Sequence, residues 1–100
     1  MSTLHLLAHS PFSDNRLDSC LPLLADDDGL LLTGDAVYAL QPGSAALQAL
    51  LQLPAGISIN ALQEDLLARG LSEYPQRVTA IDYATFVALC GHYSRVNSWL

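Results

Sequence analysis

The sequence predicts an α/β domain of three layers, in which helices cover both faces of a mostly parallel sheet of four to five strands. Short apolar runs alternate along the chain with segments whose apolar residues recur at helical spacing. The run at 29–33 is too short for a helix and too apolar for a half-solvated strand, which is typical of a strand buried on both faces of a parallel sheet. Gly34 and Asp35 end this run, and helix-compatible residues follow at 36–40.

The first half of the chain is expected to contain two strands and one full helix. Residues 3–8 form an apolar strand that ends before Pro11, since a proline forces the residue before it into an extended conformation. Ser13 or Asp14 then caps a helix over 14–24. One face of that helix carries Leu17, Cys20, Leu21 and Leu24, so Cys20 should point towards the sheet or its edge. The acidic turn at 26–28 leads into the strand at 29–33.

The second half repeats this alternation. The turn at 41–44 supplies a cap for a helix over 45–53, and the β-branched residues at 57–62 favour a third strand. A short helix over 63–69 is closed by Gly70, with Arg69 near its negative end. A fourth strand covers 78–81, and Asp82 caps a last helix over 83–93. Trp99, in the tail at 94–100, should pack on this domain or on a partner, because an exposed indole is unfavourable.

Composition indicates one domain over residues 1–100 whose surface is partly covered by another protein. Only 14% of the 100 residues are charged, against roughly 25% in typical soluble domains, while 51% are apolar. A small domain has the most surface to cover with polar groups, so this shortage favours an obligate partner. A merely apolar monomer is the alternative.

Charge excludes direct binding of nucleic acid. The chain has no lysine, and its 4 arginines against 10 carboxylates give a formal charge of −6, whereas affinity for phosphates comes largely from Lys and Arg. No run approaches the roughly 20 apolar residues that span a bilayer, and residues 1–8 lack the basic residues of a secretory signal. We therefore expect a cytoplasmic protein with no membrane contact.

No metal or cofactor is expected. The three carboxylates at 26–28 diverge at a tight turn, so they predict a solvated turn and not a metal site. Neither a glycine-rich phosphate loop nor a GxSxG elbow occurs. His5, inside a predicted strand, is expected to be a hydrogen-bonded structural residue, His9 lies where that strand ends, and His92 lies near a helix end. A free-standing enzyme is disfavoured, because no nucleophile with a base and an orienting group can be assembled.

Cys20 is the candidate group for sulfur chemistry. A thiolate can accept a sulfur atom from a persulfide by nucleophilic displacement. Arg16, on the same helical face, favours the thiolate, whereas Asp14 and Asp18 disfavour it. Cys20 is therefore either a packed core thiol or a persulfide acceptor. Cys90 is expected to be a core thiol. Without CxxC spacing the two cysteines indicate neither a zinc site nor a redox pair, and in a reducing compartment both should be thiols.

Ten segments, spread over nearly the whole chain, form a pattern whose order and spacing are more specific than any one segment. They are Leu4 to Leu6, Ser10 to Phe12, Leu30 to Leu32, Asp35 to Ala39, Ala61 to Leu62, Glu64 to Leu66, Ala68 to Gly70, Ile81 to Tyr83, Phe86 to Val87, and Trp99. In these segments the chain resembles the family of small sulfur-relay subunits called TusB in tRNA thiolation and DsrH in sulfur oxidation.

This resemblance implies a DsrE/F/H-like fold and a hetero-oligomer with TusC-like and TusD-like subunits, two copies of each. In the thiolation branch such a complex takes persulfide sulfur from a TusA-like carrier and passes it to a TusE-like one, which supports 2-thiouridine formation at the wobble position of tRNA. The central sulfur-carrying cysteine belongs to the TusD-like subunit. The chain would then be a non-catalytic or sulfur-carrier subunit of a sulfurtransferase complex.

Two alternatives remain open. Cys20 falls where DsrH-type members tend to have a cysteine, which leaves a sulfur-oxidation complex as the second branch. The other alternative is a stand-alone module that binds a small ligand at the carboxyl ends of the strands, near His9, Ser10, Gly34 and Asp35, where α/β sheets usually bind ligands.

Overall fold

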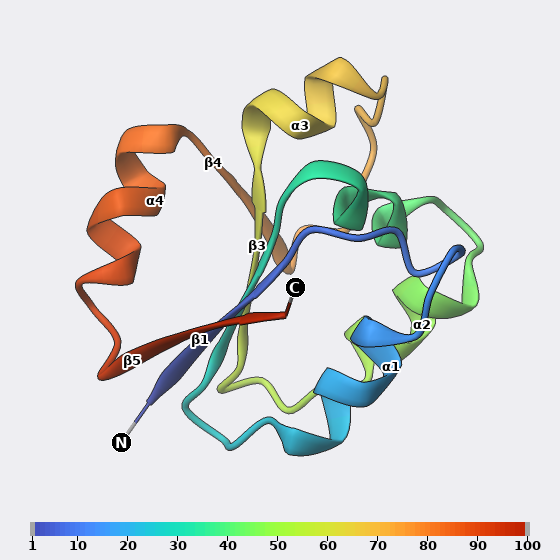
Figure 1. Ribbon diagram of the computed structural model, residues 1–100. Coiled ribbons are helices and arrows are strands. Elements are labelled where there is room, and N and C mark those ends of the chain that lie inside the picture. The colour runs from blue at the N-terminus through green and yellow to red at the C-terminus, as the bar shows by residue number, and fades with distance from the viewer. Residues whose placement is uncertain (1, 100) are drawn as a thin grey trace.

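A single sheet of five parallel strands, in the order β4-β3-β2-β1-β5, forms the middle of the molecule (Figure 1). The computed structural model describes residues 2–99. The strands are β1 (Thr3–Leu7), β2 (Gly29–Leu32), β3 (Ser58–Leu62), β4 (Val78–Ile81) and β5 (Arg95–Trp99). Every residue of the central strand β2 is buried, as expected for a parallel strand covered on both faces.

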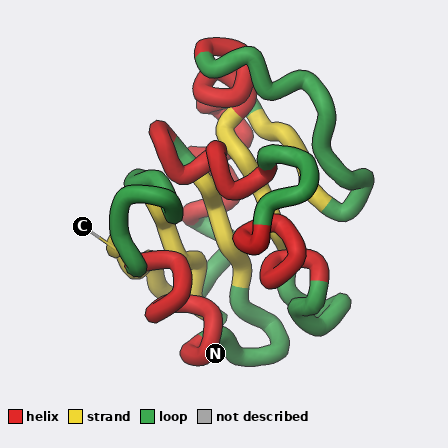
Figure 2. The backbone as a smooth tube through the Cα atoms, turned by 90° about the vertical axis from the view of Figure 1, so that its right-hand side faces the viewer, coloured by secondary structure: helices red, strands yellow, loops and turns green. Residues whose placement is uncertain are grey.

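Helices lie on both sides of this sheet, so the predicted three-layer α/β fold is confirmed. They are α1 (Arg16–Cys20), α2 (Ala45–Leu51), α3 (Gln63–Ala68), α4 (Tyr83–Cys90) and the 3₁₀ segments η1 (Leu21–Leu23) and η2 (Gly34–Leu40). Figure 1 shows α1 and α2 on one side of the strands and α4 on the other. In Figure 2 the helices on the side of α1 and α2 lie in front of the sheet.

Alternation along the strands divides the core into two clusters. We call the side of α1 and α2 the major face and the side of α4 the minor face. The strands give the major face Leu7, Leu30, Leu32, Ile59, Ala61 and Val78. They give the minor face Leu4, Leu31 and Ile81, against which Phe86, Leu89, Cys90 and Tyr93 are partly buried.

The helix expected over 14–24 is shorter than predicted. It begins at Arg16, after an Asn15 cap that makes no side-chain hydrogen bond, and from Leu21 it continues as 3₁₀. Pro22 explains this end, because a proline lacks the N–H that an α-helix needs and clashes with the carbonyl four residues earlier. The carboxylate of Asp14 still accepts the N–H of Arg16, at 3.0 Å.

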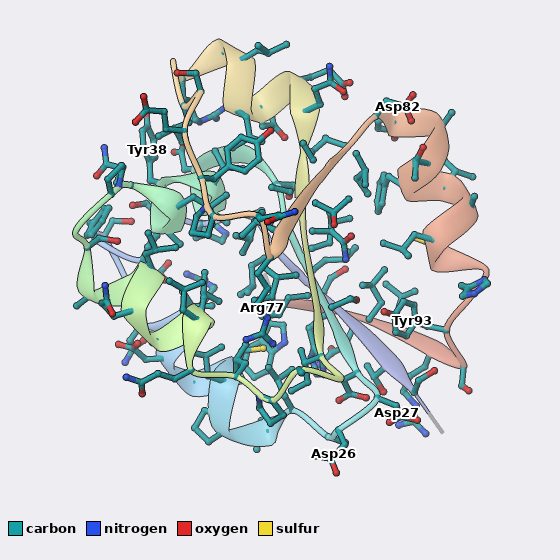
Figure 3. The ribbon with its side chains drawn as sticks, turned by 180° about the vertical axis from the view of Figure 1, so that it is seen from behind. Asp26, Asp27, Tyr38, Arg77, Asp82 and Tyr93 are labelled. Carbon is teal, nitrogen blue, oxygen red and sulfur yellow. The ribbon has the colours of Figure 1, made fainter. Side chains whose placement is uncertain are left out.

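The other two predicted caps are present. Ser44 Oγ accepts the N–H of Leu47 at 3.1 Å, and Asp82 Oδ1 accepts the N–H of Thr85 at 2.8 Å. The connection between α2 and β3 is held by Arg77, whose guanidinium donates to the carbonyls of Leu51, Leu53, Pro54 and Ile57. Figure 3 shows Arg77 beside this connection.

The tail predicted at 94–100 contains the fifth strand. β5 pairs with β1 from Thr3 opposite Arg95 to Leu7 opposite Trp99. Trp99 packs against the cluster of the major face, which confirms its packing on this domain. Leu100 lies outside the described residues. Among residues 2–99, no helix is both long enough and apolar enough to cross a membrane.

Candidate functional site

Cys20 ends α1 and faces the sheet, as predicted, with 0% of its surface exposed. Burial, and after it the negative charge of Asp28, raises the pKa of this thiol to about 12. Arg16 forms an ion pair with Asp14, which offsets the positive charge that would favour a thiolate. The geometry is that of a neutral core thiol in this isolated chain.

Asp28 corrects the prediction of a fully solvated acidic turn. Asp26 and Asp27 are exposed, and Figure 3 shows them at the outer end of the turn, but Asp28 is only 5% exposed. Its Oδ1 accepts the N–H of Thr3 at 2.9 Å, and its Oδ2 accepts the N–H of Ala25 at 3.0 Å. Burial alone would raise the pKa of Asp28, but these N–H donors, together with His5, hold it below its usual value.

His5 connects this carboxylate to the end of the chain. Its Nε2 lies 3.3 Å from Asp28 Oδ2, and the indole N–H of Trp99 donates to its Nδ1 at 3.0 Å. An indole nitrogen only donates, so Nδ1 is unprotonated and Nε2 carries the proton that Asp28 accepts. The structural role predicted for His5 is confirmed. Within residues 2–99, no group of three or more His, Cys, Asp or Glu side chains is placed to hold a metal ion.

The carboxyl ends of β2 and β3 meet at a second polar cluster, which sequence reasoning missed. Arg69 donates to Asp35 Oδ1 from Nε at 3.0 Å and from Nη2 at 2.9 Å, and it lies 3.4 Å from Asp65 Oδ1. Asp65 Oδ2 accepts the N–H of Gly34 at 2.8 Å. The hydrogen bonds from Arg69 to Asp35 are the main reason that the pKa of Arg69 is raised. Arg69 therefore joins α3 to η2, besides lying at a helix end.

This cluster bears on the ligand site proposed near His9, Ser10, Gly34 and Asp35. The N–H of Gly34 and the carboxylate of Asp35 are already bonded to Asp65 and Arg69. Ser10 Oγ accepts the N–H of Phe12 at 3.2 Å, and His9 lies 4.0 Å from Asp14. The polar groups of Ser10, Gly34 and Asp35 therefore already have partners within the protein, whereas His9 makes only a long ion-pair contact. A cavity of about 320 Å³ opens elsewhere, between Leu40, Pro42 and the loop at 73–75.

The outer side of α4 exposes large apolar side chains. Tyr83 is 61% exposed and Val87 is 60% exposed, although both are large and apolar. No Asp, Glu, Lys or Arg occurs from 83 to 94. We call the outward residues Tyr83, Thr85, Val87, Ala88 and His92 the α4 surface; all of them are exposed. The sequence signal that locates this surface is the long segment without charge.

Comparisons with known proteins identify the family. The family model described as "DsrH like protein" matches residues 9–96. Protein TusB of Erwinia tasmaniensis is 41% identical over 97 residues, and Protein TusB of Serratia proteamaculans is 42% identical over 97; each match covers 96% of this chain and 99% of the relative. Protein TusB of Escherichia coli O139:H28 is 38% identical over the same length.

A solved structure has the same fold. The crystal structure of the ychN protein from Escherichia coli superposes with a TM-score of 0.78, covering 98% of this chain and 99% of that one, at 21% sequence identity. The likeness at this identity concerns the fold alone. The match to the family model and the TusB relatives shows more: the chain belongs to the TusB/DsrH family, and that membership supports a role as a subunit of a sulfur relay.

Proposed function

We propose that this chain is a structural subunit of a cytoplasmic sulfur-relay complex, assembled with TusC-like and TusD-like proteins in two copies of each. The complex would receive sulfur from a TusA-like carrier and deliver it to a TusE-like one, in support of 2-thiolation of the tRNA wobble uridine. The observation that carries the proposal is the match to TusB proteins over almost the whole of both chains. A charge of −6 agrees with a subunit that never touches the RNA.

The surface and the thiol support a structural role. The α4 surface exposes apolar side chains without a covering element of this chain, which is typical of a surface that another protein covers. Cys20, by contrast, is enclosed. With a thiol pKa of about 12, only about one Cys20 in 100,000 would be a thiolate at pH 7, and the thiolate is the reactive form. Within the proposal, Cys20 accepts sulfur only if the assembled complex changes its surroundings.

Intact-mass analysis tests both parts. The chain is co-expressed with its TusC-like and TusD-like partners, and the purified complex is incubated with a persulfide donor. We expect all three subunits to co-purify, with the added sulfur on the TusD-like subunit and none on this chain. A sulfur adduct on this chain that is absent in Cys20→Ser but kept in Cys90→Ser would make Cys20 a relay station.

Assembly and pathway are tested separately. A stable monomer that never associates with the two partners would contradict the proposal. In a strain that lacks its TusB protein, this chain together with those partners should restore 2-thiouridine in tRNA. Unchanged tRNA alongside an intact complex would instead favour the sulfur-oxidation branch, for which the position of Cys20 is the only support in the chain.

A further inference from the structure

β5 is a strand that the rest of the molecule barely covers. Its first four residues, 95–98, are exposed, and only Trp99 is half-buried. β5 lies at one edge of the sheet and pairs only with β1 (Figure 1). An edge strand without a covering layer has little apolar burial to hold it, so its attachment depends on the backbone ladder and on its ends.

The two ends of β5 are attached differently. At its start, the N–H of Arg95 donates to the carbonyl of Ser2 at 3.2 Å, and Ser94 Oγ lies 3.5 Å from the nitrogen of Ser2. These bonds join exposed parts of the chain. At its end, the indole of Trp99 packs on the cluster of the major face, and its N–H reaches His5. Among the side chains of β5, Trp99 therefore makes the main attachment.

The attachment at Trp99 depends on one arrangement of protons. The indole N–H needs an acceptor, so Nδ1 of His5 must be unprotonated, and the proton on Nε2 then needs its own acceptor. Asp28 supplies it, and Asp28 is itself held by the N–H groups of Thr3 and Ala25. Within residues 2–99, the charged group that contacts the imidazole is Asp28, and the thiol of Cys20, which interacts with Asp28, is neutral. Each member thus fixes the orientation of the next.

We propose that Trp99, His5 and Asp28 form a lock that holds β5 on the sheet, and that β5 detaches as a unit, ahead of global unfolding, when the lock opens. Detachment of β5 exposes the edge of β1 and the part of the major-face cluster that the indole of Trp99 covers. The helices of both faces stay in place. Local opening of this kind is expected where few buried contacts hold a segment. The lock makes β5 a conformational strap controlled by a single side-chain hydrogen bond.

Hydrogen exchange in the whole protein tests the lock. Trp99→Phe keeps an aromatic ring on the core but removes the N–H donor. We expect the hydrogen-bonded amides of β5 to exchange roughly tenfold faster, the effect of losing one partly buried hydrogen bond, while those of β2 and β3 are unchanged. Tyr93→Phe is the matched control: it removes the hydroxyl that lies 2.8 Å from Ser58 Oγ, on the minor face, and should leave the exchange of β5 as in wild type.

If Trp99→Phe folds, two results would overturn the proposal. One is exchange that is unchanged in Trp99→Phe, or that rises equally in every strand. The other is a long-range ¹H–¹⁵N spectrum that places the imidazole proton on Nδ1. If Trp99→Phe does not fold, wild-type exchange at low denaturant concentrations replaces it: the β5 amides should then exchange through a small opening with weak denaturant dependence. Exchange of β5 only through global unfolding would refute the strap.

Discussion

The same strands form both faces of the sheet, but helices cover the two faces to different extents. On the major face, α1, η1, η2, α2 and α3 cover a continuous cluster of buried residues. On the minor face, α4 is the main cover, and none of its eight residues is fully buried. A helix that is apolar all round is normally enclosed, so α4 has the composition of a buried helix in an exposed position. The major face thus encloses most of the buried residues, whereas the minor face leaves apolar side chains of α4 exposed.

The largest expected effect is on the free energy of unfolding, which should fall more when the major-face cluster is truncated than when the minor-face cluster is. Leu50 is fully buried on the major face, so Leu50→Ala should lower the free energy of unfolding by about 3 kcal/mol. Leu89 is partly buried on the minor face, so Leu89→Ala should lower the free energy of unfolding by only about 1 kcal/mol. Denaturant unfolding of both variants measures the difference. Equal losses would show that the minor face is as essential to the isolated chain as the major one.

The next effect concerns the hydrogen bonds that the buried carboxylate of Asp28 accepts. Asp28→Asn should lower the free energy of unfolding at pH 7 by about 2 kcal/mol, since a charged acceptor of three hydrogen bonds becomes a neutral amide. The pKa of Asp28 is lower in the folded than in the unfolded chain. Its stabilisation is therefore present above the unfolded pKa of about 4 and is lost as the pH falls through the folded pKa.

Unfolding measured from neutral to acid pH checks this sign. The difference between wild type and Asp28→Asn should shrink as the pH falls below about 4. Asp27→Asn, at an exposed neighbouring position, is the control and should differ little from wild type at any pH. A difference between wild type and Asp28→Asn that stays constant into acid would mean that the charge of Asp28 does not contribute.

The smallest effect on stability is expected on the α4 surface. Val87→Ser should change the free energy of unfolding of the isolated chain by no more than about 0.5 kcal/mol, because this side chain is already exposed. It should nevertheless weaken co-purification with the TusC-like and TusD-like partners. Leu67→Ser, at a residue that is 70% exposed on α3, is the matched control. If Leu67→Ser disrupts assembly and Val87→Ser does not, the partner binds near α3 and not at the α4 surface.

Local signals in the sequence were sufficient for most of the fold. The four predicted strands and the caps at Ser44 and Asp82 follow from short-range patterns, and all are present. The early end of α1 also had a local signal, because Pro22 lies inside the helix that was predicted. β5 had none: an edge strand exposed on both faces lacks the apolar alternation that identifies a strand.

The polar clusters could not be predicted from local patterns. Asp28 is buried because it meets His5 and the N–H of Thr3, which are 23 and 25 residues away in the sequence. Arg69 meets Asp35 across 34 residues. In both cases a charged residue beside a turn or helix end has an ordinary solvated explanation, and only the parallel register brings its partner close. For Cys20 the helical spacing predicted its direction, whereas its depth depends on the whole major face.

The parallel pairing of β1 with β5 also decides how the protein can be tagged. Because Thr3 lies opposite Arg95 and Leu7 opposite Trp99, Ser2 lies at the amino end of this strand pair and Trp99 at its carboxyl end. A fusion joined before Ser2 leaves from the amino end of the strands, away from the indole of Trp99, whereas a fusion joined after Trp99 is tethered beside it. Joining the two positions in a circular permutant would need a linker that runs back along a whole strand, about 13 to 16 Å. Amino-terminal fusions are therefore the suitable format for assembly and exchange experiments.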